Sequence, residues 1–440
     1  MKLVLIFVML VSSLFGEIKI DEAWQRVQKL NDGLLASSGD IKRAELKQAS
    51  AESLYLPSVS VSASYTHLDK PIGLDLNLPI PLPGIGSSIP IDFSEQDILL
   101  SDLRIMYPLY TGGKIDAASD AYAAKVSESR SKHKMQEDKA FLNLIKLYYG
   151  VVISESLYET RKESQTSLEL HFEHAQKLKE QGQIAKVELL NAQVKLDSAK
   201  IETTKAKHKL EIVTSALHKM IKQNNSPASL LFVGGEVDSQ SHYADESVEN
   251  FAALGVLDAK DKQALALVDI KKSAWHPQVA AYANVNLYKD DSVLMETMPN
   301  WLAGVAVSFE LFGRSDRSSD IQAAELLHSK VIHLKAQAKE DLRLAVEKTY
   351  NEMSLYKEEF ESLSSSLELA RENYRLRNIA FSEGLSTSVE VVDAQMFLSG
   401  AKTKRFNAAY NYVKSLSQLC VLSGDNELFF KLESLSEGIK

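Results

Sequence analysis

The sequence predicts an α+β membrane protein, in which a few membrane-spanning β-strands are joined to helices too long to be contained in a membrane. Three observations predict this class. Short segments alternate apolar with small polar residues, two long segments are rich in helix-forming residues and free of proline, and an internal repeat gives each half of the chain one strand pair and one helical segment. Composition alone would not indicate it, because the hydrophobic fraction is 45% and the charged fraction 25%.

The N-terminal segment 1–16 predicts a secretory signal peptide, because Lys2 precedes an apolar run and Gly16 offers a cleavage site. No later segment has eighteen consecutive apolar residues, so we expect no transmembrane helix after it. Cys420 is the only cysteine, which excludes an intrachain disulfide, and we expect it to pack inside a helix bundle. The formal net charge of −9 argues against nucleic acid as a partner.

Four segments read as β-strands, at about residues 58–68, 99–109, 278–288 and 301–311. Their length of about ten residues fits the wall of a membrane barrel, with apolar side chains toward lipid and polar ones toward a water-filled lumen. The expected lumen side chains of the first strand are small hydroxyls: Ser58, Ser60, Ser62, Ser64 and Thr66. Four strands cannot close a barrel, so several copies would have to share one. The soluble alternative is two separate hairpins packed on helices.

The sequence contains an internal repeat. "GQIAKVELLNAQ", residues 182–193, returns as "GLSTSVEVVDAQ", residues 384–395, and the strand pairs match in the same order. We therefore expect a first repeat over 17–240 and a second over 241–440. The first copy is longer in the segment 69–97, which holds half of the ten prolines and is predicted to be a loop.

Long helices are predicted over about 113–225 and 313–424, where no proline occurs. A continuous helix from 113 to 180 would reach about 100 Å, far beyond the roughly 30 Å of a bilayer core. It must therefore project into an aqueous compartment. Gly182 and Gly384 mark reversals that produce antiparallel helical hairpins. The returning helices carry apolar residues at the spacing of coiled-coil packing: Val187, Leu190, Val194, Val389, Val392 and Met396.

Motifs for catalysis are missing from the sequence. We found no phosphate-binding loop and no metalloprotease motif, so we expect no enzyme activity, no cofactor and no metal site. Glu390 and Asp393 are the exception among the charged residues, because their spacing places two carboxylates on one helix face near a reversal. A solvated helix face is the alternative interpretation. The equivalent residues of the first repeat are Glu188 and Asn191.

The sequence resembles the TolC-type outer-membrane efflux family in five motifs: "YLPSVSVSASYT", "YPLYTGG", "EQGQIAKVELLNAQ", "SFELFGRSDRSSDIQAAE" and "SEGLSTSVEVVDAQ". The resemblance implies a homotrimer in the outer membrane of a Gram-negative bacterium. Its twelve-stranded β-barrel would continue into a periplasmic tunnel of twelve coiled-coil helices. A mixed α/β belt would surround the tunnel, formed partly by 226–247 and by the tail after Gly424.

The resemblance also implies a function. The chain would be a passive exit channel for small molecules such as drugs, contacting outer-membrane lipid and docking to a periplasmic adaptor and an inner-membrane RND or ABC pump. A type I protein-secretion duct and a coiled-coil tether without a pore are the alternatives. Glu390 and Asp393 would form the periplasmic gate, and the helix tips would dock the adaptor. The expected docking residues are Gly182, Val187, Gly384, Leu385, Ser386 and Val389, where Ser386 replaces an arginine common in the family.

Overall fold

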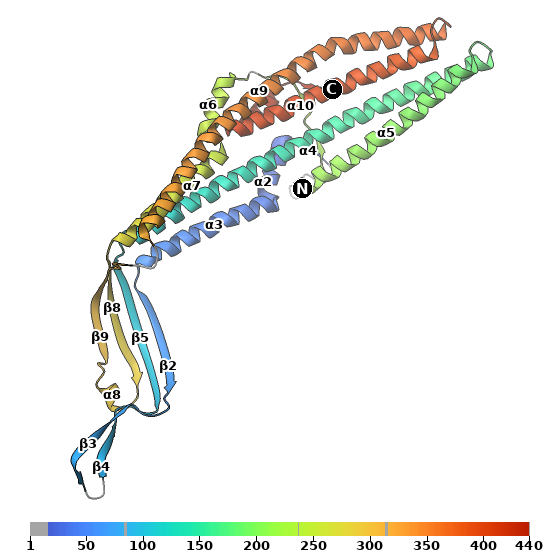
Figure 1. The fold of residues 1–440 in the computed structure, drawn as a ribbon. Coiled ribbons are helices and arrows are strands. Elements are labelled where there is room, and N and C mark those ends of the chain that lie inside the picture. Colours follow the sequence, from blue (N-terminus) through green and yellow to red (C-terminus); the bar gives the residue numbers. More distant parts are fainter. Residues whose placement is uncertain (1–15, 83–85, 236, 313–315, 440) are drawn as a thin grey trace, which may run out of the picture. The chain divides into compact units, whose positions relative to one another are not determined.

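The computed structural model describes residues 16–82, 86–235, 237–312 and 316–439, so the expected signal peptide lies outside them except for Gly16. Long helices and β-strands make up the chain (Figure 1). It divides into two compact units: unit 1 holds residues 1–41, 128–257 and 334–440, and unit 2 holds 42–127 and 258–333. Each expected repeat contributes to both units.

Unit 2 contains a four-stranded antiparallel sheet (Figure 1). Its strands are β2 (Ser58–His67), β5 (Asp97–Tyr110), β8 (Gln278–Lys289) and β9 (Trp301–Ser308), in the order β2-β5-β8-β9. The central pair, β5 with β8, joins the two halves of the chain. All four expected strands are present, although β9 ends at Ser308, three residues earlier than the alternation suggested. The outer edges of β2 and β9 have no partner within the described residues.

The register gives this sheet one polar and one apolar face. Residues directly opposite each other in antiparallel strands share a face. Ser62 lies opposite Asp102, whereas Val61 lies opposite Leu103, which in turn lies opposite Val285. The hydroxyl side chains of β2 therefore share a face with the polar residues of β5. The contrast is clearest where β2, β5 and β8 meet; on β9 the same face carries Leu302, Gly304, Ala306 and Ser308.

The segment 69–97, predicted to be a loop, contains a β-hairpin instead. Strands β3 (Gly73–Leu82) and β4 (Gly86–Asp92) pair antiparallel, with Leu74 opposite Ile91 and Asp75 opposite Pro90. The prediction was wrong because it weighed the prolines above the alternation of apolar and polar residues. A two-stranded hairpin leaves many N–H groups outside its ladder, so prolines are tolerated there.

Backbone hydrogen bonds anchor the base of this hairpin. Phe93 N donates to Ile72 O at 2.7 Å, and Ile72 N donates to the Oγ of buried Ser94 at 2.9 Å. The connection between β8 and β9, which holds the short helix α8 (Val293–Glu296), also contributes: Leu294 N donates to Phe93 O at 2.7 Å. The two loops at this end of the sheet are therefore joined.

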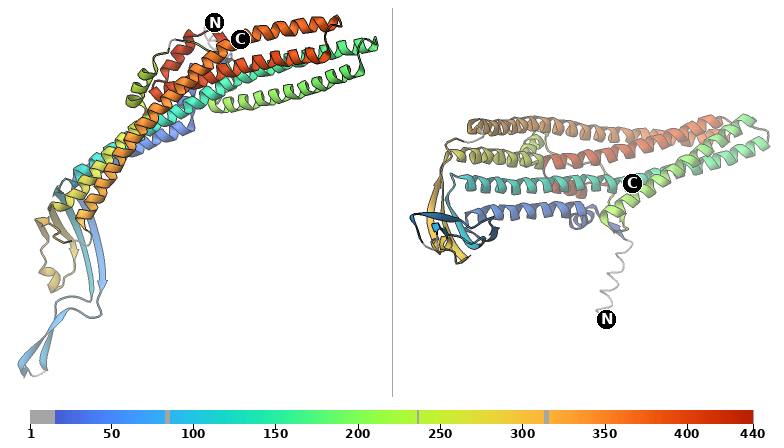
Figure 2. Two further views of the ribbon diagram at one scale, coloured as in Figure 1. Left: turned by 45° about the horizontal axis from the view of Figure 1, so that its top comes forward. Right: turned by 60° about the horizontal axis from the view of Figure 1, so that its bottom comes forward.

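Unit 1 holds most of two antiparallel helical hairpins, visible in both views of Figure 2. The first joins α4 (Lys114–Glu180) to α5 (Lys186–Ile221), and the second joins α9 (Arg317–Ser382) to α10 (Ser388–Ser423). Gly182 and Gly384 end α4 and α9 at φ angles of 74° and 72°, in the left-handed region that glycine adopts at little cost. The reversals lie where the sequence predicted them.

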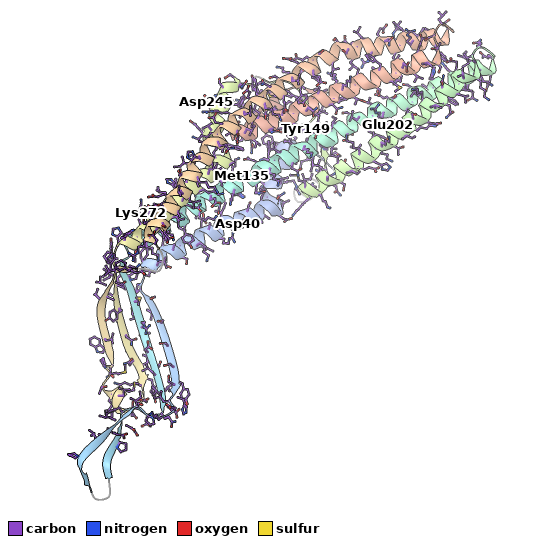
Figure 3. All side chains as sticks on the ribbon, viewed as in Figure 1. Asp40, Met135, Tyr149, Glu202, Asp245 and Lys272 are labelled. Carbon is purple, nitrogen blue, oxygen red and sulfur yellow. The ribbon has the colours of Figure 1, made fainter. Side chains whose placement is uncertain are left out.

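The core of unit 1 gathers around an aromatic pair on α4. Tyr148 and Tyr149 are fully buried, and Tyr149 is labelled in Figure 3. The Tyr148 hydroxyl donates to Ile18 O at 2.7 Å and accepts from the backbone N–H groups of Ala228 and Ser229 at 3.0 and 2.9 Å. One side chain thus fixes the N-terminal segment and residues 228–229 against the helices.

Helix α4 is the one described helix that is long and apolar enough, by length and composition, to cross a membrane, and 56% of its apolar window is buried. Phe141, Leu144 and Ile145 of this helix pack into the core of unit 1. Its apolar character is therefore explained by packing. Cys420 on α10 is buried in the same core, as predicted.

Two pairs of two-residue strands lie outside the four-stranded sheet. Residues 226–247 and the tail contact each other, because β7 (Leu231–Phe232) pairs antiparallel with β10 (Gly438–Ile439). In parallel register, β6 (Ser226–Pro227) pairs with β1 (Glu17–Ile18). The remaining helices are α2 (Ile20–Leu30), α3 (Asp32–Glu52), α6 (Gln240–Asn250), α7 (Ala252–Lys272) and α11 (Glu427–Leu435).

The substitutions Val61→Lys and Ser62→Lys test which face of the sheet lies against lipid. On the apolar face, a lysine near the bilayer midplane should cost about 2 to 4 kcal/mol and reduce membrane assembly. On the polar face, one residue away at nearly the same depth, the charge lies beside Asp102 and should be tolerated. The yield of folded, membrane-inserted protein, read from heat-modifiable gel migration, measures the difference. Equal losses in both variants would contradict the assignment.

Candidate functional site at the helix tips

The tips of the two hairpins carry exposed apolar side chains. Leu385 is 81% exposed, Val187 57% and Val389 44%. Gly182 and Gly384 have open space where a side chain would begin, so only their backbone conformation requires glycine. These expected docking residues are therefore available to a partner in the single chain.

The apolar stripe predicted on α5 does not pack within the chain. Val187, Leu190 and Val194 are all more than half exposed, whereas Ala192 and Leu196 are buried. On α10, Val392 is buried, whereas Val389 and Met396 are 44% and 52% exposed. Coiled-coil packing of the α5 stripe therefore stays a prediction about contacts between copies of the chain.

Glu390 caps its own helix. Thr387 is the N-cap of α10, and its Oγ1 accepts from Glu390 N at 3.3 Å. The Glu390 carboxylate accepts from Thr387 N at 2.9 Å and from Ser386 Oγ at 2.7 Å, and it lies 3.1 Å from Nη1 of Arg377 on α9. These contacts, the Ser386 bond foremost, hold the pKa of Glu390 below its usual value. The carboxylate is a structural part of the tip.

Asp393, the other expected gate residue, is exposed and has no hydrogen bond or ion pair within the described part of the chain. The two carboxylates share a helix face and both reach solvent, since the Glu390 side chain is 42% exposed, but only Asp393 lacks a partner within the described residues. In a single chain the structure does not bring them together into one site.

Glu188 has a different role from its repeat equivalent Glu390. The N-cap of α5 is Ala185, which has no side-chain oxygen, so a capping box cannot form there. The carboxylate of Glu188 instead reaches the other hairpin, where its Oε2 accepts from Ser388 N at 3.1 Å. It thereby satisfies a first-turn amide of α10, whose N–H has no partner inside the helix.

A second contact joins the hairpins at the same residue. His171 on α4 places its Nε2 2.6 Å from the Oγ of Ser388, and both residues are buried. The His171 ring packs 4.6 Å from the ring of Phe381 on α9, centroid to centroid. Burial, together with nearby His174, lowers the pKa of His171 to about 4. The neutral ring therefore holds Ser388 from one side while Glu188 holds its backbone.

These contacts at the helix tips were not identified from the sequence. The pattern Thr387-Ser-Val-Glu390 is the signature of a capping box and could have been recognised. The contacts of Arg377 and His171 could not, because His171 and Ser388 are 217 positions apart and no local pattern links them.

The expected lumen residues of β2 are all exposed on the polar face of the sheet. Ser62 is tied to the next strand, since its Oγ donates to Asp102 Oδ1 at 2.5 Å. Among the described residues, no group of three or more histidine, cysteine, aspartate or glutamate side chains could hold a metal ion.

Comparisons with known proteins agree with this architecture. A sequence model of the outer membrane efflux protein family matches residues 24–221 and 244–425. The fold is similar to that of the outer membrane protein VceC from Vibrio cholerae, with a TM-score of 0.76 at 13% identity over 92% of this chain and 96% of that one.

Two further solved channels have the same fold. The CmeC outer membrane channel of Campylobacter jejuni has a TM-score of 0.71 at 16% identity, over 94% of this chain and 89% of that one. The open state of the MtrE outer membrane channel of Neisseria gonorrhoeae has a TM-score of 0.75 at 16% identity, over 94% and 90%. A comparison with curated protein sequences found no match.

The buried His171 predicts a pH-dependent stability. Its folded pKa of about 4 lies below the ordinary 6.5, so the unfolded chain takes up this proton first as pH falls. Stability should decrease between pH 6.5 and about 4, by at most about 3 kcal/mol. The variant His171→Gln should lose this part of the pH dependence in urea unfolding. The variant His208→Gln, at an exposed site on α5, should retain it. Identical profiles for wild type and His171→Gln would contradict the assignment.

Proposed function

The chain belongs to the outer membrane efflux protein family, and we propose that three copies form the passive exit channel of a tripartite efflux system. Members of this family are outer-membrane channels with a periplasmic helical tunnel, and they work with adaptors and inner-membrane pumps. The proposal includes the division into repeats over 17–240 and 241–440. The two matched segments support this division, because one lies mainly in each repeat.

The observation that carries the proposal is the amphipathic sheet with two open edges. In lipid, every unpaired backbone N–H or C=O group costs several kcal/mol. If β9 of one copy pairs with β2 of the next, three copies close a twelve-stranded barrel and no edge remains. The apolar face then contacts lipid and the polar face lines the lumen. A tether without a pore would leave the apolar face without a role.

The helix tips support docking to a periplasmic adaptor. The docking surface that we propose is formed by Gly182, Val187, Gly384, Leu385, Ser386 and Val389. Its apolar side chains are exposed in the single chain, and exposed apolar groups of this kind gain free energy when a partner covers them. An RND or ABC pump would supply the energy for export, so the channel itself needs no catalytic centre.

Single-channel recording tests the proposed function. Purified protein should migrate as a heat-sensitive trimer in detergent and produce discrete conductance steps in planar bilayers. The Val61→Lys variant is the matched control, because it should reduce the number of channels without changing the conductance of those that assemble. A protein that inserts as a trimer and never conducts would favour the tether.

The gate gives a second test, and the tip geometry makes it specific. Three unpaired Asp393 carboxylates would meet at the narrow periplasmic end and favour cations. The Asp393→Asn variant should therefore weaken cation selectivity and block by trivalent cations. Glu390→Gln should do so less, because Arg377 already neutralises that carboxylate.

Glu188→Gln serves as the control for the gate. Its amide oxygen can still accept from Ser388 N, and the residue lies in the first hairpin, so its effect on selectivity should be small. Equal effects of Glu188→Gln and Asp393→Asn in planar bilayers would locate the constriction elsewhere.

A further inference from the structure

We infer that Arg104 is a specificity-determining residue of the channel, whose guanidinium binds solutes carrying a carboxylate or phosphate group as they pass through the β-barrel. The inference rests on the proposed trimeric channel and adds a second charged level to it, separate from the gate at the helix tips.

Arg104 lies in the middle of β5, on the polar face of the sheet. The residues opposite it are Ser60 on β2 and Asn284 on β8, and neither carries a charge. Its side chain is exposed, and no hydrogen bond or ion pair holds it within the described residues. The guanidinium is therefore free to contact a solute.

Asp102, two positions earlier on the same face, forms no ion pair with Arg104 within the described strands. Its Oδ1 accepts from Ser62 Oγ at 2.5 Å. With the Asn284 amide turned so that its nitrogen faces the carboxylate, Asn284 donates to Asp102 Oδ2 and to Leu103 O, both at 3.1 Å. Side chains on both neighbouring strands, Ser62 and Asn284, therefore hold the Asp102 carboxylate close to the sheet. The anion is fixed by hydrogen bonds, while the cation two residues away is unpartnered.

The polar face offers no other free cation in the described strands. Lys289, at the end of β8, donates to Met298 O at 2.9 Å. Apart from Asp102, the other residues of this face are uncharged, such as Thr66, Asn286 and Leu302. Arg104 is thus the main positive charge that a solute would encounter along this face of the barrel.

Assembly does not change these surroundings. β5 is an interior strand, flanked by β2 and β8 of its own chain, so copies added at the edges bring no new neighbour beside Arg104. Three copies would place three guanidinium groups around the lumen at one height. Each has five N–H donors in a planar fork that matches a carboxylate or phosphate bidentately. An oxyanion is accordingly the class of group that this level recognises.

The test compares three variants in planar bilayers with a salt gradient and with citrate added as a multivalent carboxylate. Arg104→Gln should raise the cation-to-anion permeability ratio by at least about threefold and weaken the citrate effect on the current. Arg104→Lys keeps the charge but loses the fork, so it should keep the permeability ratio and weaken only the citrate effect. Inorganic phosphate should behave like citrate.

Asp97→Asn is the matched control, because Asp97 lies on the same strand but opposite His67, on the other face of the sheet. It should change neither quantity. If Arg104→Gln channels conduct with an unchanged permeability ratio and unchanged citrate effect, the inference is overturned while the channel stands. A wild-type trimer that never conducts would overturn the proposed function, and this inference with it. Gel migration of each variant as a trimer establishes that the comparison is made on assembled protein.

Discussion

The pairing of β5 with β8 is the interaction on which the rest of the membrane part depends. It joins the two halves of the chain into one sheet with a single polar and a single apolar face, so all four strands obey the same solvent assignment. It also leaves two open edges, one from each half. Because a lipid environment does not tolerate unpaired backbone groups, an amphipathic sheet with open edges requires further copies of itself. The proposed trimer is thus supported by backbone chemistry before any side-chain contact between copies is considered.

The repeat gives the chain two similar tips, and the difference between Ala185 and Thr387 changes how each is capped. Thr387 allows Glu390 to close a capping box on its own helix, whereas Ala185 does not allow Glu188 to do so. Glu188 is therefore available to bind the other hairpin at Ser388. The first hairpin supports the second, and the second keeps an unpaired carboxylate at Asp393. The equivalent glutamates of the two repeats therefore act differently, one as a local cap and the other as a link between hairpins.

Much of the fold could be predicted because it depends on local periodicity. The strands follow from alternation, the helices from composition and the absence of proline, and the reversals from Gly182 and Gly384. The β3–β4 hairpin was missed because its prolines were read as loop residues, although a two-stranded hairpin accommodates them. The tip contacts were missed for a different reason: the link between His171 and Ser388 depends on two helices from different repeats lying together, which no local pattern records.

Hydrogen bonds within the chain determine which charged side chains remain available to bind a solute. At the tip, Glu390 is occupied by Ser386, Thr387 and Arg377, so Asp393 presents the free charge. In the sheet, Ser62 and Asn284 occupy Asp102, so the free charge belongs to Arg104. In each pair the occupied carboxylate is held by the structure, and in the proposed channel its neighbour is the group free to bind a mobile ion directly. Counting acidic and basic residues along the lumen would miss this distinction, because a carboxylate already held by fixed donors has little remaining capacity to bind a mobile ion.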